Sequence, residues 1–360
     1  MKQNRLERVI RNMEEMGLEQ LVVSAPASVF YLTGAWVNPG ARMLALYVHK
    51  SGETRLFVNR LFALTPESAG APLCDFDDTD DPVALLSQSV RPGRLGIDKA
   101  WPSQFTLRLM DARSDVKPVL GSAPVDDARM YKDAEEIALM RESSRKNDQS
   151  ILAAMSAIRA GATEADIAAA YNRTARSLGS SGPSFPTLIC FGANCAEPHH
   201  VTDDTPLRRG DSVILDVGLT WRYYASDMTR TVFYGEPTDE QKRVHELVCR
   251  ANAAGRAAAR PGVPLRDVDR AARKVIEDAG YGQYFIHRTG HGIGLEGHEP
   301  PNASATETRV AAPGMVFSVE PGVYLPGRFG VREEDLVLIT EDGAETLNAV
   351  PHEPRVIPAE

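Results

Sequence analysis

The sequence predicts an α+β protein with two domains, an α/β domain over residues 1–126 and a larger α+β domain over residues 127–360. Three observations lead to this prediction. A chain of 360 residues exceeds the usual length of one domain. Short apolar strands alternate with helical patterns in the first part, as in a small α/β domain. A polar, turn-rich segment at residues 124–129 then precedes a part in which helices and antiparallel strands form separate runs.

The first domain is expected to open with a helix and to continue with short strands. Apolar residues in 2–17 recur every three or four positions, which predicts an amphipathic helix that ends at Gly17. Ser51 and Gly52 separate two apolar runs and predict a hairpin. Residues 30–36 are expected to turn into a loop. The predicted strands cover residues 21–26, 43–50, 53–60 and 95–98.

The second domain is expected to begin with two helices and to end in strands. Thr163 is the predicted N-cap of the second helix, because Asp166 follows three positions later in a variant of the capping box. The predicted helices cover residues 131–161, 162–179, 239–260 and 264–279, and the closing strands cover 315–325, 334–340 and 345–350.

Composition excludes several classes of protein. The net charge of −9 and the lack of a basic patch argue against a nucleic-acid partner. The sequence has no run of roughly 18 apolar residues, so no membrane span is predicted. The polar start of the chain lacks the apolar core of a signal peptide. The four cysteines have no metal-finger spacing and are interpreted as scattered reduced thiols. We therefore expect a cytoplasmic protein with no membrane partner.

Two aspartates form the first candidate cluster. Asp216 follows the apolar run SVIL, and Asp227 precedes the strand-like run MTRTVFY. A hairpin between these runs would bring both carboxylates to one place. Two carboxylates packed so closely repel each other unless a cation lies between them. On spacing alone, both remain equally open to interpretation as ordinary turn residues.

A glycine-lined histidine forms the second cluster. His291 lies between Gly290 and Gly292, so little side chain shields it, and His298 follows seven residues later. Glycines let the backbone pass close to a ligand. This pattern favours a ligand or catalytic group over a core histidine. It is not interpreted as a phosphate-binding P-loop, because the lysine that such a loop needs is missing.

Two glutamates form the third cluster. Glu320 ends the apolar run MVFSV, and Glu334 opens the run DLVLIT, with turn-forming Pro-Gly pairs between them. A hairpin-like excursion again brings carboxylates together. Glu333 and Asp335 flank Glu334, so spacing alone does not show which of the three points inward.

Together the clusters offer four carboxylates and one imidazole. Such an oxygen-rich set suits a site for manganese, cobalt, iron or zinc, whereas a structural zinc site is usually rich in cysteine. Four carboxylates balance the charge of two divalent ions. The corresponding chemistry is attack of a metal-activated water on a carbonyl, with the two ions roughly 3–4 Å apart.

These motifs resemble the creatinase and methionine-aminopeptidase superfamily, whose members have the pita-bread fold. The sequence is most similar to the Xaa-Pro dipeptidase (prolidase) and aminopeptidase P branch of peptidase family M24. The resemblance is strong from about residue 130 onward and looser over the first 125 residues, which look like a creatinase-type N-terminal domain. The most specific strings are SDMTRT, HRTGHGIGLE, HEPP, EPGVY and GVREED.

The resemblance assigns a role to each metal residue. It implies that Asp216 chelates one metal, while Asp227 and Glu334 bridge both. His291 and Glu320 would complete the coordination of the other. The expected cofactor is a pair of divalent ions, manganese first, with cobalt, zinc or iron as alternatives.

The resemblance also implies catalytic groups around the metals. His199 would line the substrate site, and His298 would hydrogen-bond the scissile carbonyl or the tetrahedral intermediate. Glu320 would also act as general base for the bridging water. Arg332 resembles the arginine that orients the ligands near Glu334.

Some positions depart from the family pattern. Trp221 stands where the family often has tyrosine, and Tyr223 stands where glycine is expected. Glu333 replaces a residue that is usually aliphatic. Trp221 and Tyr224 are predicted to contact the substrate, and the replacement of tyrosine at position 221 leaves open what Trp221 does there.

The predicted reaction is hydrolysis of the Xaa-Pro bond in dipeptides by a metal-bridging water or hydroxide, in a homodimer. A dipeptidase must bind the free α-carboxylate of its substrate, and a bidentate arginine suits that task. Arg42, Arg60 and Arg328 are candidates, and Arg42 is favoured because it follows a loop that in the family can reach a neighbouring active site.

Three alternatives stay open at this stage. One is an Xaa-Pro aminopeptidase acting on longer peptides, and another is a C–N hydrolase or lyase of the same fold with a non-peptide substrate. The third is a metal-free binding module. Family members that abandon metals typically lose the ligands, and this chain keeps all five.

Other histidines have simpler interpretations. For His200, beside His199, a solvated or structural position and a role in the site are equally open, and His287 is expected to pack against the loop that it supports. His49, His245 and His352 are expected at the surface.

Overall fold

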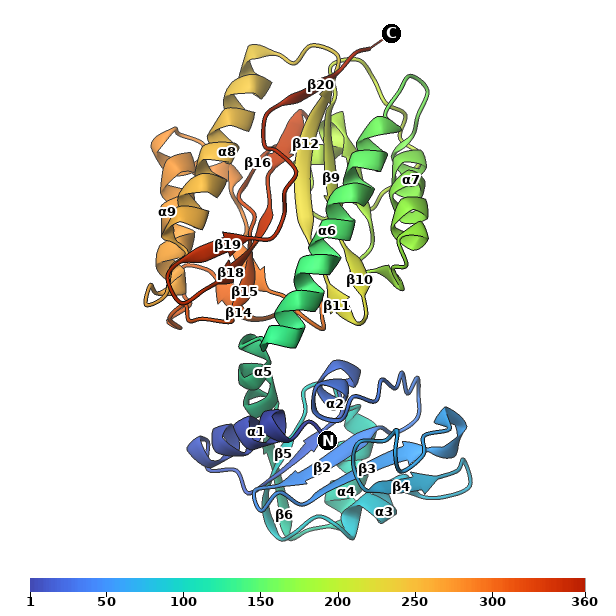
Figure 1. Ribbon diagram of the computed structural model, residues 1–360. Coiled ribbons are helices and arrows are strands. Elements are labelled where there is room, and N and C mark those ends of the chain that lie inside the picture. Colours follow the sequence, from blue (N-terminus) through green and yellow to red (C-terminus); the bar gives the residue numbers. More distant parts are fainter. Residues whose placement is uncertain (360) are drawn as a thin grey trace. The chain divides into compact units, whose positions relative to one another are not determined.

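The computed structural model describes residues 1–359, which divide into two compact units, Met1–Arg129 and a second unit that begins at Met130. Each unit is described by itself (Figure 1). The segment predicted as a turn-rich linker is instead part of helix α5 (Ala123–Met130). Asp126 in its first turn and Arg129 in its last turn complement the helix dipole, and Pro124 is tolerated so near a helix start.

The first unit is built on a six-stranded mixed sheet in the order β4-β3-β2-β1-β5-β6. Strands β1, β2 and β3 pair antiparallel, while β3–β4, β1–β5 and β5–β6 pair parallel. The strands are β1 (Gln20–Val23), β2 (Ala45–His49), β3 (Thr54–Asn59), β4 (Leu73–Phe76), β5 (Gly93–Ile97) and β6 (Val116–Leu120). The helices are α1 (Gln3–Glu15), α2 (Pro26–Thr33), α3 (Pro82–Ser87) and α4 (Ser103–Ala112), with a short 3₁₀ turn at Arg60–Phe62.

The predicted hairpin at Ser51 and Gly52 is confirmed, because β2 and β3 pair across it. The loop predicted over residues 30–36 is wrong for its first part, since α2 extends to Thr33, and is confirmed from Gly34 onward. This helix is apolar on all sides and carries no amphipathic period that would reveal it. Pro26 at its start and the left-handed Gly34 at its end were the available signals.

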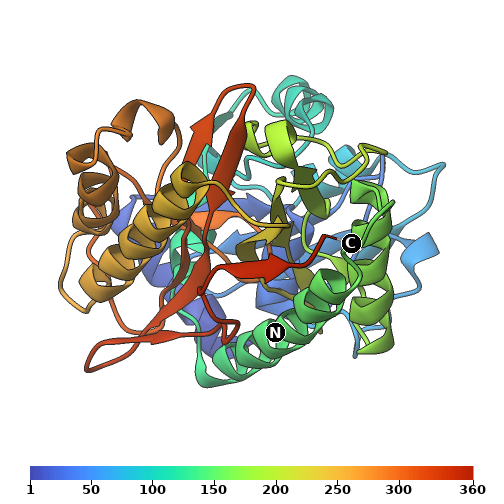
Figure 2. The same ribbon diagram turned by 90° about the horizontal axis from the view of Figure 1, so that it is seen from above.

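Four helices flank the strands of the second unit: α6 (Ala134–Ser156), α7 (Glu164–Ser177), α8 (Asp239–Ala258) and α9 (Leu265–Asp278). Helices α6 and α7 pack together on one side, and α8 and α9 on the other (Figures 1 and 2). The predicted capping box of Thr163 and Asp166 is present, and Thr238 forms another with Gln241. Among residues 1–359, no helix is long and apolar enough to cross a membrane.

Two main sheets lie between these helix pairs. One has the order β20-β12-β9-β8 and the other the order β14-β13-β15-β18-β19. Their strands are β8 (Leu188–Phe191), β9 (Ser212–Val217), β12 (Met228–Tyr234), β20 (Arg355–Ile357), β13 (Gly290–Gly292), β14 (Glu299–Ala303), β15 (Val316–Val319), β18 (Asp335–Ile339) and β19 (Ala344–Thr346). Smaller sheets join β16 (Gly322–Leu325) with β17 (Phe329–Arg332), and β7 (Gly182–Pro183) with β10 (Leu219–Trp221) and β11 (Tyr224–Ala225). Short 3₁₀ turns lie at Gly192–Ala196 and Gly282–Tyr284.

Each helix pair buries an apolar face against one sheet. Ile151 of α6 and Tyr171 of α7 pack with Leu215 of β9, while Val268 of α9 packs with Phe317 of β15. Each such side chain contributes about 1.5–3 kcal/mol when it is buried. The predicted α+β class is confirmed, and the helix-backed sheets hold the polar ends of their strands in fixed positions.

Candidate metal centre and active site

The first two candidate ligands lie on one hairpin, as the sequence predicted. Strands β9 and β12 pair antiparallel, with Thr229 opposite Asp216 and Met228 opposite Val217. Asp216 lies within β9, and Asp227 lies immediately before β12. Asp227 is only 3% exposed, so its charge has almost no access to water.

Tight backbone packing places His291. A Cβ atom on Gly290 would lie 1.8 Å from the carbonyl oxygen of Ser318, and one on Gly292 would lie 2.3 Å from that of Pro300. Only glycine permits these approaches, which hold β13 against its neighbours. The imidazole Nε2 of His291 then lies 3.7 Å from Oδ2 of Asp227 and 3.4 Å from Oε1 of Glu320.

Glu320 and Glu334 enter the same space from two further strand ends. Glu320 directly follows β15, and the hydroxyl of Ser318 donates a hydrogen bond to its Oε1 at 3.1 Å. Glu334 lies between β17 and β18. The hydroxyl of Thr229 donates to Glu334 Oε2 at 2.8 Å, and Arg230 donates to the Glu334 carbonyl oxygen at 2.6 Å. Both side chain and backbone of Glu334 are therefore fixed.

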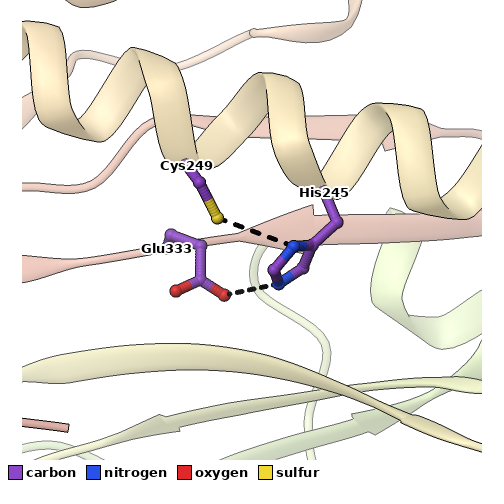
Figure 3. A group of neighbouring side chains, drawn as sticks. All are labelled: His245, Cys249 and Glu333. Atoms are coloured by element: carbon purple, nitrogen blue, oxygen red, sulfur yellow. Dashed lines mark hydrogen bonds and ion pairs between the residues drawn. The ribbon is translucent and has the colours of Figure 1, made fainter. Parts of the chain in front are cut away.

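The structure shows which of the three consecutive acids faces the other candidate ligands. Glu333 and Asp335 point away from Asp227, and the two nitrogens of His352 lie 2.8 Å from a carboxylate oxygen of each. Glu333 faces helix α8 (Figure 3). Side chains alternate along an extended chain, so Glu334 points to the opposite side.

Unpaired oxygens show that this donor set fits a cation. Ligand atoms of Asp227, His291 and Glu334 lie within 4.8 Å of one another. Within residues 1–359, Oδ1 of Asp227 and Oε1 of Glu334 are buried and accept no hydrogen bond. A buried acceptor without a partner costs roughly 1–3 kcal/mol, and a charged one costs more. A bound divalent ion would satisfy both oxygens.

The electrostatics of these side chains support the same conclusion. Burial, followed by the charges of Glu334 and Asp216, raises the pKa of Asp227 well above its usual value. Burial raises the pKa of Glu320 to about 7. Burial, followed by the charge of His298, lowers the pKa of His291 to about 3, so the ring is neutral as a metal ligand requires. Carboxylates crowded in this way ionise fully only when a cation compensates their charge.

Arg332 links the ligands to one another. Its guanidinium contacts the carboxylate of Asp216, donates to the hydroxyl of Tyr324 at 3.0 Å, and lies 3.3 Å from the Thr229 hydroxyl that binds Glu334. The predicted orienting role remains a prediction, but the structure puts Arg332 against Asp216 directly and against Glu334 only through Thr229.

A cavity of about 790 Å³ opens over the five candidate ligands. His199 and His298, the two predicted catalytic histidines, both line it. The His298 ring lies 3.9 Å from the His291 ring, measured between centroids. The lining residues are Phe185, Pro186, Thr187, Leu188, Pro198, His199, His200, Val201, Thr202, Asp216, Asp227, His287, Arg288, His291, His298, Glu320, Arg332 and Glu334.

Hydrogen bonds to Glu164 hold the loop that carries His199. This carboxylate accepts hydrogen bonds from the backbone nitrogen of Phe191 and from Asn194, and His200 Nε2 lies 2.8 Å from it. The structure thus favours the structural interpretation of His200. The surface position expected for His49 and His245 is wrong, because both are buried, and His352 is only partly exposed.

The two predicted aromatic substrate contacts do not line the cavity. The ammonium nitrogen of Lys146 lies over the Trp221 ring, 4.1 Å from the ring centroid. The hydroxyl of Tyr224 lies 2.9 Å from a carboxylate oxygen of Glu136 in α6. Both side chains belong to the packing of α6, and their predicted contact with substrate finds no geometric support.

The three arginines proposed from the sequence all have acidic partners. Arg42 belongs to the first unit, where it makes hydrogen bonds of 2.9 and 2.8 Å to Asp78. Arg60 pairs with Asp75 and Asp77, and Arg328 pairs with Glu240.

Sequence reasoning missed Arg288. This residue lines the cavity and is exposed. The structure shows no hydrogen bond or ion pair for it within residues 1–359. Its charge lowers the pKa of His298 after burial does so, and it also acts on Glu320. Its position three residues before His291 was the available signal.

Comparison with known families agrees with this geometry. Residues 138–341 match the model of metallopeptidase family M24, and residues 5–131 match the creatinase/prolidase N-terminal domain. The chain belongs to metallopeptidase family M24. It therefore has the pita-bread fold behind a creatinase-type N-terminal domain, as the resemblance implied.

Relatives place this M24 chain with the prolidase branch. It is 39% identical over 352 residues to a probable dipeptidase PepE of Mycobacterium tuberculosis, covering 96% of this chain and 93% of that protein. It is 34% identical over 351 residues to the Xaa-Pro dipeptidase of Pyrococcus furiosus, covering 97% and 99%. The crystal structure of a prolidase from Thermococcus sibiricus has a TM-score of 0.94 and 29% identity, with 99% of each chain covered.

Proposed function

We propose that this M24 chain hydrolyses the bond before proline in Xaa-Pro dipeptides, with two divalent ions, manganese first, held by the five candidate ligands. The bound ions would supply an activated water and polarise the scissile carbonyl. Support comes from the relatives named as Xaa-Pro dipeptidase and prolidase and from the unpaired carboxylate oxygens of Asp227 and Glu334. A homodimer in the cytoplasm is part of the same proposal.

The residues of this chain would bind and orient the substrate around the metals. His298 would donate a hydrogen bond to the carbonyl oxygen of the scissile bond, since burial lowers its pKa and so favours the neutral ring. His199 would hold the reacting group from the opposite loop. Glu320 would accept a proton from the attacking water.

One observation favours a dipeptide over a longer substrate. Arg288 is a cation without a partner in the described chain, and it lines the same cavity as the metal residues. Arg332, the other arginine in the lining, is already bound to Asp216 and Tyr324. A free guanidinium suits bidentate binding of a carboxylate. In a dipeptide, the only carboxylate at the main-chain end lies on the proline that follows the scissile bond.

The cavity wall has the chemistry that a proline ring requires. Phe185, Leu188 and Val201 line it with apolar surface. This apolar wall and the guanidinium of Arg288 together would select a proline residue with a free carboxylate. Arg42, the arginine favoured from the sequence, remains a second candidate for the same contact.

The test compares kcat/KM for Ala-Pro, Ala-Pro-amide and Ala-Pro-Ala with added manganese. We expect the wild type to prefer Ala-Pro, and Arg288→Met to lose Ala-Pro turnover at least tenfold while it hydrolyses Ala-Pro-amide as the wild type does. Arg328→Met, which changes an exposed arginine already paired with Glu240, is the matched control.

The outcomes separate the alternatives. A wild type that prefers Ala-Pro-Ala would be an aminopeptidase, and one that cleaves none of these peptides would disprove the proposed function. If Arg42→Ala shows the selective loss and Arg288→Met does not, Arg42 is the carboxylate-binding residue.

A further inference from the structure

A second cluster of possible ligands lies on the side of Glu333 that faces away from the candidate metal centre. Helix α8 carries His245 and Cys249 one turn apart, and Glu333 reaches them from the segment between β17 and β18 (Figure 3). Ligand atoms of the three residues lie within 4.8 Å of one another. Glu334, the next residue along, points to the opposite side, so the two clusters share a backbone segment and no side chain.

The cluster contains an unsatisfied buried nitrogen. Nδ1 of His245 lies 3.6 Å from Sγ of Cys249, and Nε2 lies 3.4 Å from Oε1 of Glu333. Within residues 1–359, Nε2 of His245 has no hydrogen-bond partner, although the residue is only 1% exposed. A buried polar atom in this state usually has a function or a missing partner.

The surroundings of Cys249 favour a positive ion. Burial raises the pKa of its thiol, and the charges of Glu333, Asp335 and Glu353 raise it further, while Arg230 opposes them. More acidic than basic groups thus act on the sulfur atom. The same field that disfavours a thiolate attracts a metal cation, which would compensate the thiolate that it creates.

We propose that His245, Cys249 and Glu333 form a metal site, distinct from the candidate catalytic centre, that takes a thiol-binding divalent ion of the zinc type. One imidazole, one thiolate and one carboxylate are ligands that zinc accepts and that manganese or magnesium does not select. The Sγ–metal bond forms as the thiol proton leaves to solvent. Water supplies the fourth ligand, because Cys249 is partly exposed.

The spacing of the atoms fits such an ion after one adjustment. Zinc–sulfur and zinc–nitrogen bonds of about 2.3 and about 2.0 Å place tetrahedral ligand atoms roughly 3.3–3.6 Å apart. The distances from His245 to Sγ of Cys249 and to Oε1 of Glu333 match this range, but the first is measured from Nδ1 and the second from Nε2. The His245 ring must therefore turn until one nitrogen faces both other ligands. Oε1 of Glu333 accepts one hydrogen bond, from Thr231, and keeps a lone pair for the metal.

A metal ion bound at this second site would connect helix α8 to the segment that carries Glu334. Oε2 of Glu333 is already held by His352 at 2.8 Å, so a metal on Oε1 would fix the carboxylate from both sides. The site would stabilise this part of the fold and leave the substrate cavity unchanged, since none of its three ligands lines that cavity.

The test uses cobalt as a spectroscopic probe of the full-length, metal-free protein. The candidate catalytic ligands are oxygen and nitrogen atoms, so a thiolate-to-cobalt absorption band in the near ultraviolet would report only a cysteine site. We expect the wild type to show this band and to bind one more ion per chain than Cys249→Ser, which should lack the band and keep peptidase activity. Cys74→Ser, which changes a partly exposed thiol of the first unit, is the control that should keep the band.

A second measurement does not depend on a variant. Zinc added to wild-type protein whose catalytic centre is already loaded with manganese should slow alkylation of Cys249 at least tenfold, as followed by peptide mass spectrometry, and should leave Cys74 unchanged. Equal alkylation with and without zinc would overturn the proposal, as would a cobalt spectrum identical in the wild type and Cys249→Ser.

Discussion

The hydroxyl of Thr229 donates a hydrogen bond of 2.8 Å to Oε2 of Glu334, across 105 positions of sequence. Thr229 lies opposite Asp216 in the β9–β12 hairpin and two residues after Asp227. The strand pair that positions Asp216 and Asp227 thus also orients a third candidate ligand. This contact leaves Oε1 of Glu334 as the oxygen without a partner within residues 1–359.

Loss of the Thr229 hydroxyl should weaken metal binding without removing a ligand. In Thr229→Val, Glu334 loses the donor that fixes its carboxylate, and changes to such supporting contacts typically cost roughly 10–100-fold in metal affinity. Titration with manganese measures the affinity. Thr229→Ser, which keeps the hydroxyl, should bind like the wild type, and a similar loss in both variants would contradict this explanation.

Removal of the metals should make stability fall as the pH rises. In the metal-free chain, burial raises the pKa of Asp227 and Glu334 well above their usual values and that of Glu320 to about 7. Groups with a raised folded-state pKa favour folding below their unfolded pKa of about 4, and this contribution is lost as the pH rises through the folded value. The difference in unfolding free energy between metal-loaded and chelated protein should therefore grow from pH about 4.5 to about 7.5.

Urea unfolding with and without chelator at these two pH values measures that difference. A difference that stays constant, or that shrinks toward neutral pH, would mean that the buried carboxylates are compensated by something other than bound metal.

Replacement of Glu164 should lower kcat although this residue does not line the cavity. Its buried carboxylate accepts hydrogen bonds from Phe191, Asn194 and Asp203 and contacts His200, so it fixes the loop on which His199 lies. Glu164→Ala would leave these donors unpaired, at a cost of about 1–3 kcal/mol for each one that stays buried. We expect a lower unfolding free energy and a reduced kcat, with metal content unchanged.

Glu164→Gln is the informative comparison, because it keeps an acceptor oxygen in place. It should recover part of the lost stability and kcat. Unchanged kcat in Glu164→Ala would show that His199 is positioned without this anchor.

His352 should contribute stability that disappears in alkaline solution. Burial opposes its charged form, but hydrogen bonds to Asp335 and Glu333 outweigh burial and raise its pKa above 6.5. A raised histidine pKa contributes stability that is fully present below the unfolded value and is lost as the pH rises through the folded value. His352→Gln should therefore be less stable than the wild type at pH about 5.5, and the gap should narrow at pH about 9. Chemical denaturation at both values tests this, and a gap that widens with pH would contradict it.

The five candidate ligands lie around one cavity, as hairpin spacing and the family resemblance both predicted, and their role as metal ligands stays a prediction. Spacing indicated that Asp216 and Asp227 flank a turn, and the family pattern selected Glu334 from three adjacent acids. Burial could not be foreseen so easily. His245 was expected at the surface of its helix, yet it packs edge-on against Phe233 and faces Glu333, an acid where the family usually has an aliphatic residue.

Arg288, the residue proposed to bind the substrate carboxylate, was harder to predict for a different reason. Arg42 was favoured because it follows a turn-rich loop, but no sequence pattern shows that Asp78 already neutralises it, or that Glu240 neutralises Arg328. Arg288 differs from these arginines because it has no hydrogen-bond or ion-pair partner within residues 1–359. Such pairing depends on contacts between residues far apart in the chain, and only the folded structure displays it.

The close packing around Gly290 and Gly292 has a consequence for engineering this enzyme. No other amino acid fits at these positions without displacing the backbone of Ser318 or Pro300. Directed evolution toward new substrates should therefore recover almost no variants at residues 290 and 292, however large the library. Diversity is better introduced at Phe185, Leu188 and Val201, whose side chains line the cavity and whose replacement leaves the strand that carries His291 in place.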